Sequence, residues 1–98
     1  MNAIILAAYR DDLRTRLRAQ GLIHLDVLVR GSHVVVYGLE PDGEKVNRAR
    51  LTWLHGQTFA LSIADPRRGR WNATGETGPF DRLVTLLLQQ FAFILADW

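Results

Sequence analysis

The last twenty residues of the chain, 79–98, carry more apolar side chains than a small domain easily buries. Proline is favoured at the first position of a helix, so Pro79 predicts that a helix begins there and continues to the end of the sequence. Its broad apolar stripe consists of Phe80, Leu83, Val84, Leu87, Leu88, Phe91, Ile94, Leu95 and Trp98. Leu86 and Phe93 stand on a different line of the same helix. One face therefore suits a core, and the other predicts a partner.

The length of the chain limits it to one domain, residues 1–98. Ninety-eight residues are enough for one modest core. Apolar residues make up 48% and charged residues 22% of the sequence, which is ordinary for a globular protein and argues against disorder. The apolar run at 3–8 is too short for the core of a signal peptide, and no basic stretch precedes it. We expect a cytoplasmic protein with no membrane partner.

Hydrophobic periodicity predicts a helix first and antiparallel strands after it. From residue 22 the apolar spacing changes to two, and Gly31-Ser32 has the length and chemistry of a hairpin turn. The predicted elements are a helix at 3–19, strands at 22–30, 34–36, 46–54, 58–64 and 70–73, a flexible link at 75–78 and a helix at 79–98. The predicted fold class is α+β: an N-terminal helix, a four- to five-stranded antiparallel meander and a C-terminal helix, with both helices on one face of the sheet.

One strand register places every apolar set on the same face of this sheet. A slip of one residue would turn Arg48 and Arg50 into the core. The register predicts that Trp53 and Trp71 both lie beneath the helices. The core positions it predicts on the first four strands are Ile23, Leu25, Val27, Val29, Val34, Val36, Ala49, Leu51, Trp53, Phe59, Leu61 and Ile63.

The opposite face of the predicted sheet, called the outer face below, is not uniformly polar. Its apolar residues are Leu28, Val35, Tyr37, Leu39 and Leu54. Together with Leu86 and Phe93 of the last helix, they predict a homodimer or an unknown protein partner. The alternative is that aliphatic residues fit a pleated surface and tolerate partial exposure.

No motif for catalysis or for metal binding is present. The absence of cysteine excludes disulfides, thiolate metal sites and thiol nucleophiles. His24 and His33 fall at opposite ends of the first predicted hairpin, about 20 Å apart at roughly 3.3 Å per residue, so they cannot share an ion. Ser32 and Ser62 lie in a turn and a strand, not in the strand-to-helix elbow of a serine hydrolase. We therefore expect no enzymatic activity, no cofactor and no metal.

Two groups of basic residues are candidate anion sites. In the first, Arg48 lines up with Tyr37 and Asp26 across three strands of the outer face, with Arg50 beside them. Such a row suits a small anion or an RNA base stacked on the tyrosine. A cross-strand ion pair with a tyrosine spacer is the alternative.

The second group is the predicted hairpin tip, where Arg67, Arg68 and Arg70 adjoin Trp71. Basic residues beside an aromatic side chain suit single-stranded nucleic acid, and the amides at the start of the last helix attract anions. Two acidic residues near that helix end, Glu76 and Asp81, are expected to compete.

The net charge of +2 is too small to make nucleic acid the first choice of partner. The leading interpretation is therefore a non-enzymatic, self-associating interaction domain. A nucleic-acid or phosphate-ligand binding module that uses the outer face and the tip at 67–71 is the alternative.

Overall fold

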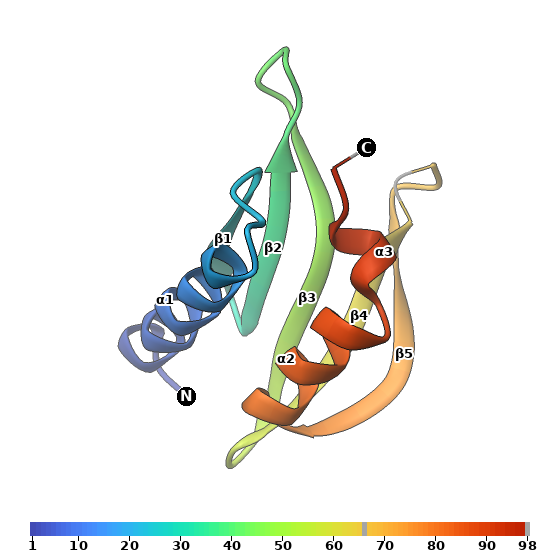
Figure 1. Cartoon of the computed structure of the whole chain (residues 1–98). Helices are drawn as coiled ribbons and strands as arrows, with labels where there is room; N and C mark the ends of the chain where they lie inside the picture. Colours follow the sequence, from blue (N-terminus) through green and yellow to red (C-terminus); the bar gives the residue numbers. More distant parts are fainter. Residues whose placement is uncertain (66, 98) are drawn as a thin grey trace.

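The computed structural model describes residues 1–65 and 67–97 and has the predicted α+β architecture. Its elements are α1 (Ala3–Ala19), β1 (Leu25–Arg30), β2 (His33–Leu39), β3 (Lys45–His55), β4 (Thr58–Asp65), β5 (Arg70–Pro79), α2 (Phe80–Gln89) and α3 (Ala92–Leu95). The five strands form one antiparallel sheet in chain order, and the helices lie on the same face of it (Figure 1). Pro66 of the predicted turn and Trp98 of the predicted helix stripe lie outside the described residues.

Helix α1 has a sequence-encoded start and stop. The Asn2 side chain caps it, because its Oδ1 accepts a hydrogen bond from the Ile5 N–H at 3.0 Å. Gly21, just beyond the helix, takes a φ of +76°, the left-handed conformation that favours glycine. Three buried leucines of α1 face β1 and β2. No helix in the described ranges is long and apolar enough to cross a lipid bilayer.

An aromatic cluster joins the two main helices to the sheet. Tyr9 of α1, Phe59 of β4 and Phe80 of α2 pack with ring centroids 4.6 to 5.1 Å apart. At the surface above them, Arg16 of α1 lies 3.2 Å from the Asp81 carboxylate of α2. This cluster is the part of the core that links both helices to β4.

Most predicted core positions are confirmed. The buried ones are Leu25, Val27, Val34, Val36, Ala49, Leu51, Phe59 and Leu61. Val29, Trp53 and Ile63 are partly buried at the edge of the core. The prediction for Ile23 is wrong: β1 begins only at Leu25, and the Ile23 side chain is 79% exposed.

The prediction of one helix over 79–98 is also wrong. Helix α2 ends at Gln89, and Phe91 has a non-helical backbone with φ −113° and ψ 24°. After this break the chain folds back over β3, where Ile94 and Leu95 are buried. Burial of these two side chains compensates for the lost helical hydrogen bonds.

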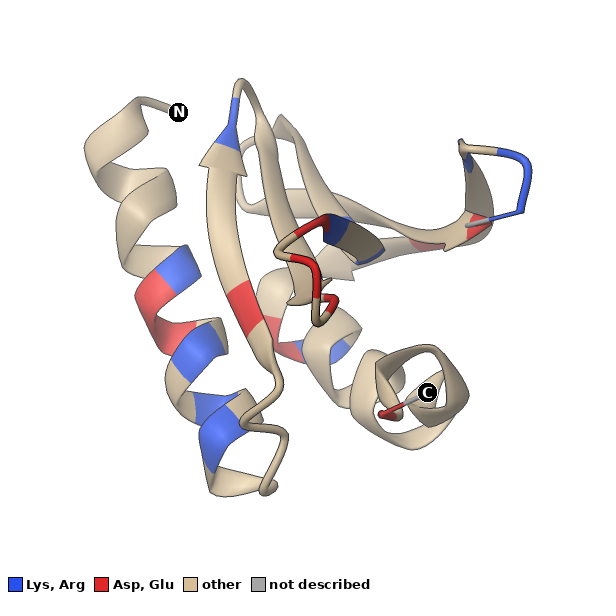
Figure 2. Cartoon of the chain, turned by 90° about the horizontal axis from the view of Figure 1, so that it is seen from above, with Lys and Arg blue, Asp and Glu red and all other residues tan. Residues whose placement is uncertain are grey.

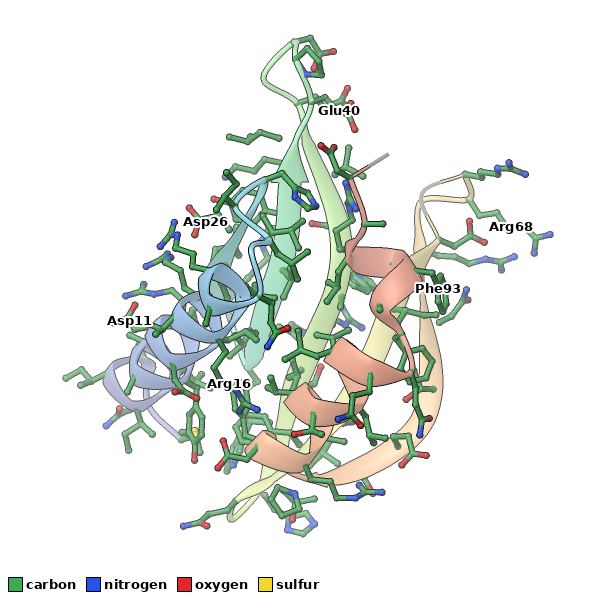
Figure 3. The ribbon with its side chains drawn as sticks, viewed as in Figure 1. Asp11, Arg16, Asp26, Glu40, Arg68 and Phe93 are labelled. Atoms are coloured by element: carbon green, nitrogen blue, oxygen red, sulfur yellow. The ribbon has the colours of Figure 1, made fainter. Side chains whose placement is uncertain are left out.

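Because of the break, Leu86 and Phe93 do not form one line. Leu86 packs against the core, whereas Phe93 is 61% exposed on α3 (Figure 3). The predicted partner surface on the C-terminal helix is therefore reduced to Phe93.

Strand β5 is longer than predicted and includes the expected link at 75–78. Residues 74–76 form a bulge opposite Leu61, and the Thr74 hydroxyl donates to the Leu61 carbonyl at 2.8 Å. On the tip side of this bulge Trp71 is paired with Ala64, which points away from the helices. The predicted inward orientation of Trp71 is therefore wrong.

Replacing Phe59 by alanine should lower the free energy of unfolding by about 3–5 kcal/mol, because it removes the fully buried ring of the aromatic cluster. Trp53→Ala should cost less, since Trp53 is only partly buried. Urea denaturation measures both. The control is Ile4→Ala, which changes a side chain that is 81% exposed and should stay within about 0.5 kcal/mol. Equal losses for Phe59→Ala and Ile4→Ala would contradict this description of the core.

Candidate functional site

A β-bulge in β3 decides which basic residues reach the outer face. Pairing between β2 and β3 follows the predicted register up to Val36, and then Tyr37 opposes Asn47. Arg48 is the extra residue, so it leaves the alternation of the strand. The predicted outer-face row that contains Arg48 is therefore wrong.

Arg48 lies on the face that carries the helices. The residue is 4% exposed, and its Nη1 donates to the carbonyls of Ile94 at 3.1 Å and Ala96 at 2.6 Å. Gly38 leaves room for the guanidinium, since a Cβ there would lie 3.2 Å from one of its nitrogens. Arg48 therefore holds the C-terminal segment on the sheet and is not part of an outer-face anion site.

Asp26, which the sequence places in the same row, forms an ion pair with Arg14 of α1. Its carboxylate lies 2.6 Å from Nε of Arg14 and accepts the Val27 N–H at 2.8 Å. Burial tends to raise the pKa of Asp26, but the hydrogen bonds from Val27 and Arg14 outweigh it and bring the pKa below its usual value. Arg14 also donates to the Val27 carbonyl, so this cluster covers the free edge of β1.

Arg50 occupies the middle of the outer face, where the sequence predicts it. It pairs with Val35 on β2 and Ser62 on β4, and its Cζ lies 4.6 Å from the centroid of the Trp71 ring. Its Nε is buried and, within the described residues, has no hydrogen-bond partner. Burial lowers the pKa of Arg50, and the group still stays charged at neutral pH.

A hollow of about 380 Å³ opens beside this guanidinium and is called the first hollow below. Arg30, His33, Lys45 and Asn47 line it together with Arg50. In the part of the chain that the structure describes, no carboxylate lies within 4.0 Å of any of its three cations. The first hollow therefore presents uncompensated positive charge.

His33 contributes a titratable group to the first hollow. Its Nδ1 lies 2.7 Å from the Thr52 hydroxyl on β3. Burial, and then the positive charge of Arg50, hold the pKa of His33 below its ordinary value of 6.5.

A second hollow of about 250 Å³ adjoins the first and shares Lys45, Asn47 and Trp71 with it. Its other lining residues include Arg70 and the acidic Glu44, so its charge is mixed. Arg50 does not line this hollow. The Trp71 indole thus stands between a cationic hollow and a mixed one.

The predicted hairpin tip is the turn between β4 and β5, which carries basic residues and projects from the body (Figure 2). Arg67 and Arg68 are exposed, and both backbone N–H groups donate to the Asp65 carboxylate. Arg68 points outward at the tip, with its Nε 3.7 Å from that carboxylate (Figure 3). The tip therefore adds two exposed cations next to Arg70, which lines the second hollow.

The start of α2 does not adjoin this tip, which corrects the predicted arrangement. Pro79 pairs with Thr58, at the opposite end of β5 from Arg70. Glu76 and Asp81, the acidic residues expected to compete at that helix start, pair with Arg82 and Arg16 respectively and not with the tip.

Charge is consequently unequal between this surface and the rest of the chain. The two hollows and the tip hold six of the twelve cationic residues and only two of the ten acidic ones, a local charge of +4. The remainder carries −2. The net charge of +2 conceals this separation.

The predicted outer-face interface is partly covered within the chain, at Leu28, Val35 and Tyr37, whereas Leu54 is 45% exposed at the end of β3. Val35 is 6% exposed, Leu28 is half-buried, and Lys45 lies over the Tyr37 ring with Nζ 5.1 Å from its centroid. Leu39 is 61% exposed, at the end of β2. The apolar part of the outer face thus offers less surface to a partner than its sequence suggests.

Arg30, His33, Lys45 and Asn47 are the site residues that the sequence argument missed. Arg30 and His33 flank the first hairpin turn, and the alternation of β1 and β2 already places both on the outer face. Lys45 and Asn47 reach it because of the bulge at Arg48.

No three histidine or acidic side chains within 1–65 and 67–97 are close enough together to hold a metal ion. No protein-family model, no curated protein and no solved structure matches the chain. The geometry of the two hollows is therefore the basis for assigning a function.

Replacing His33 by glutamine should reduce the loss of stability on acidification. The pKa of His33 is lower in the folded than in the unfolded state, so below about pH 6.5 the unfolded state binds more protons. The free energy of unfolding therefore decreases as the pH is lowered. The melting temperature between about pH 8 and pH 5 measures this. The control is His55→Gln, at the exposed end of β3, which should leave the wild-type slope. Identical slopes for all three proteins would contradict the role of His33.

Proposed function

We propose that the outer face of the sheet binds single-stranded nucleic acid and that the protein is a non-enzymatic binding module. The observation that carries this proposal is Arg50, a partly buried guanidinium held against Trp71 beside the first hollow. A cation in such a place, with no carboxylate partner in the described chain, suits a phosphate group.

The distribution of charge supports a ligand with several phosphates. Arg30, Lys45 and Arg50 around the first hollow, with Arg70 and the tip beyond the second, make a basic path across three strands and a turn. Nucleic-acid affinity depends on such clustering and not on the net charge of the whole chain. This role agrees with the cytoplasmic location predicted from the sequence.

The aromatic side chains of the same face favour a single strand over a duplex. Trp71 and Tyr37 both lie beside cations on the outer face. Unpaired bases expose ring faces that can stack on such side chains, whereas the bases of a duplex are stacked on each other. A basic groove with aromatic side chains is the usual arrangement for binding single strands.

Replacing Arg50 by methionine should weaken binding to a single-stranded oligonucleotide by roughly ten- to a hundredfold, because a hydrogen bond to a charged group contributes about 1.5–3 kcal/mol. The slope of log affinity against log salt should become shallower by about 0.7. Fluorescence anisotropy between about 0.05 M and 0.2 M salt measures both quantities. The control is Arg18→Gln, on the exposed face of α1, which should bind like the wild type.

The stability of Arg50→Met distinguishes a binding role from a structural one. Methionine removes the buried Nε and retains most of the apolar contact but loses the contact of the charge with the Trp71 ring, so the free energy of unfolding should stay within about 1 kcal/mol of the wild type. A marked loss of stability, or oligonucleotide affinity equal to that of the wild type, would overturn the proposal.

Self-association, the leading interpretation from the sequence, stays a prediction and is the second candidate. Phe93 of α3 is exposed, and its ring centroid lies 6.3 Å from that of Phe91, just before the helix. Of the two residues predicted to bind a partner from the last helix, it is the exposed one. Light scattering at high micromolar concentration should show a dimer that Phe93→Glu converts to a monomer. Leu39→Glu tests the outer face in the same way. A wild-type monomer at that concentration would exclude the homodimer.

A further inference from the structure

We infer that the second hollow is a base-binding subsite in which one face of Trp71 stacks on a nucleobase while the phosphate beside that base lies in the first hollow. This inference rests on the proposed function and adds the part of the ligand that each hollow receives. It concerns the side of Trp71 that faces away from Arg50.

The two sides of the Trp71 indole have different surroundings. The Arg50 guanidinium covers one of them, with Cζ 4.6 Å from the ring centroid. Trp71 lines both hollows, whereas Arg50 lines only the first. The second hollow therefore opens on a part of the indole that Arg50 leaves uncovered, and Trp71 is only half-buried.

The charges of the second hollow argue against a phosphate there. Glu44 and Asp65 both line it and oppose the charges of Lys45 and Arg70. A phosphate has a better site in the first hollow, where the described residues include three cations and no acidic group. An uncharged, flat group is the better occupant of the second hollow.

The remaining lining provides space and a polar edge. Ala64 and Gly69 contribute no long side chain. The Asn47 amide, at the junction of the two hollows, offers both a donor and an acceptor to the edge of a base. A base stacked on Trp71 would thus have a hydrogen-bonding group beside it.

The test compares an oligonucleotide of about eight nucleotides with an abasic strand of the same length and phosphate number. The wild-type protein should bind the base-bearing strand about five- to 150-fold more tightly, as expected for stacking of one base on an aromatic side chain. In Trp71→Leu this preference should fall by at least about fivefold, the lower value for one stacked base, whereas Trp71→Phe, which keeps an aromatic face, should retain most of it.

A second variant separates stacking from the support that Trp71 gives to Arg50. Ala64→Leu places additional carbon atoms in the second hollow and changes neither Arg50 nor Trp71. It should lower affinity for the base-bearing strand toward that of the abasic strand, with abasic affinity within about twofold of the wild type.

The outcomes are distinct for the two proposals. Equal affinity for both strands in the wild type, with binding that still depends on Arg50, would overturn the base subsite and leave the proposed function intact. A preference as large in Trp71→Leu as in the wild type would also overturn the subsite. Absence of measurable binding to either strand at low salt would overturn both.

Discussion

The bulge at Arg48 determines the chemistry of both faces of the sheet. An uninterrupted strand would point Arg48 away from the helices, beside Tyr37. The extra residue instead sends the guanidinium beneath α3, where it binds the carbonyls of Ile94 and Ala96 that so short a helix cannot satisfy itself. The same shift puts Asn47 on the outer face, at the junction of the two hollows.

Alternation of apolar residues predicts the orientation of a strand residue only while the register is uninterrupted. It placed Val27, Val36 and Leu51 correctly, as well as Arg50, because the first hairpin and the middle of β3 pair without an extra residue there. No glycine or proline marks the bulge at Arg48, so nothing in the local sequence signals it. The sequence therefore predicts that the sheet has an outer face, but it does not predict which residues of β3 before the bulge lie on that face.

Trp71 and the last helix show two further limits of sequence periodicity. A large aromatic residue usually contributes to a core, but the pairing of Trp71 with Ala64 follows from the turn that joins β4 and β5. Helical spacing continues through residues 89–91, where the helix in fact ends. The contacts that fix the chain beyond this break come from distant positions, including His24, whose Nε2 lies 2.7 Å from the Leu95 carbonyl.

A sheet with helices on one face leaves the apolar residues of its other face to be covered by side chains. Val35 is 6% exposed because its neighbours, Arg50 among them, provide that cover. Leucine or methionine would cover Val35 as well and would avoid the cost of desolvating a guanidinium. Packing explains a long side chain at position 50, and the Trp71 ring, 4.6 Å from its Cζ, favours a cation there. The proposed phosphate ligand would add the hydrogen bond and the counter-charge that the described part of the fold does not supply.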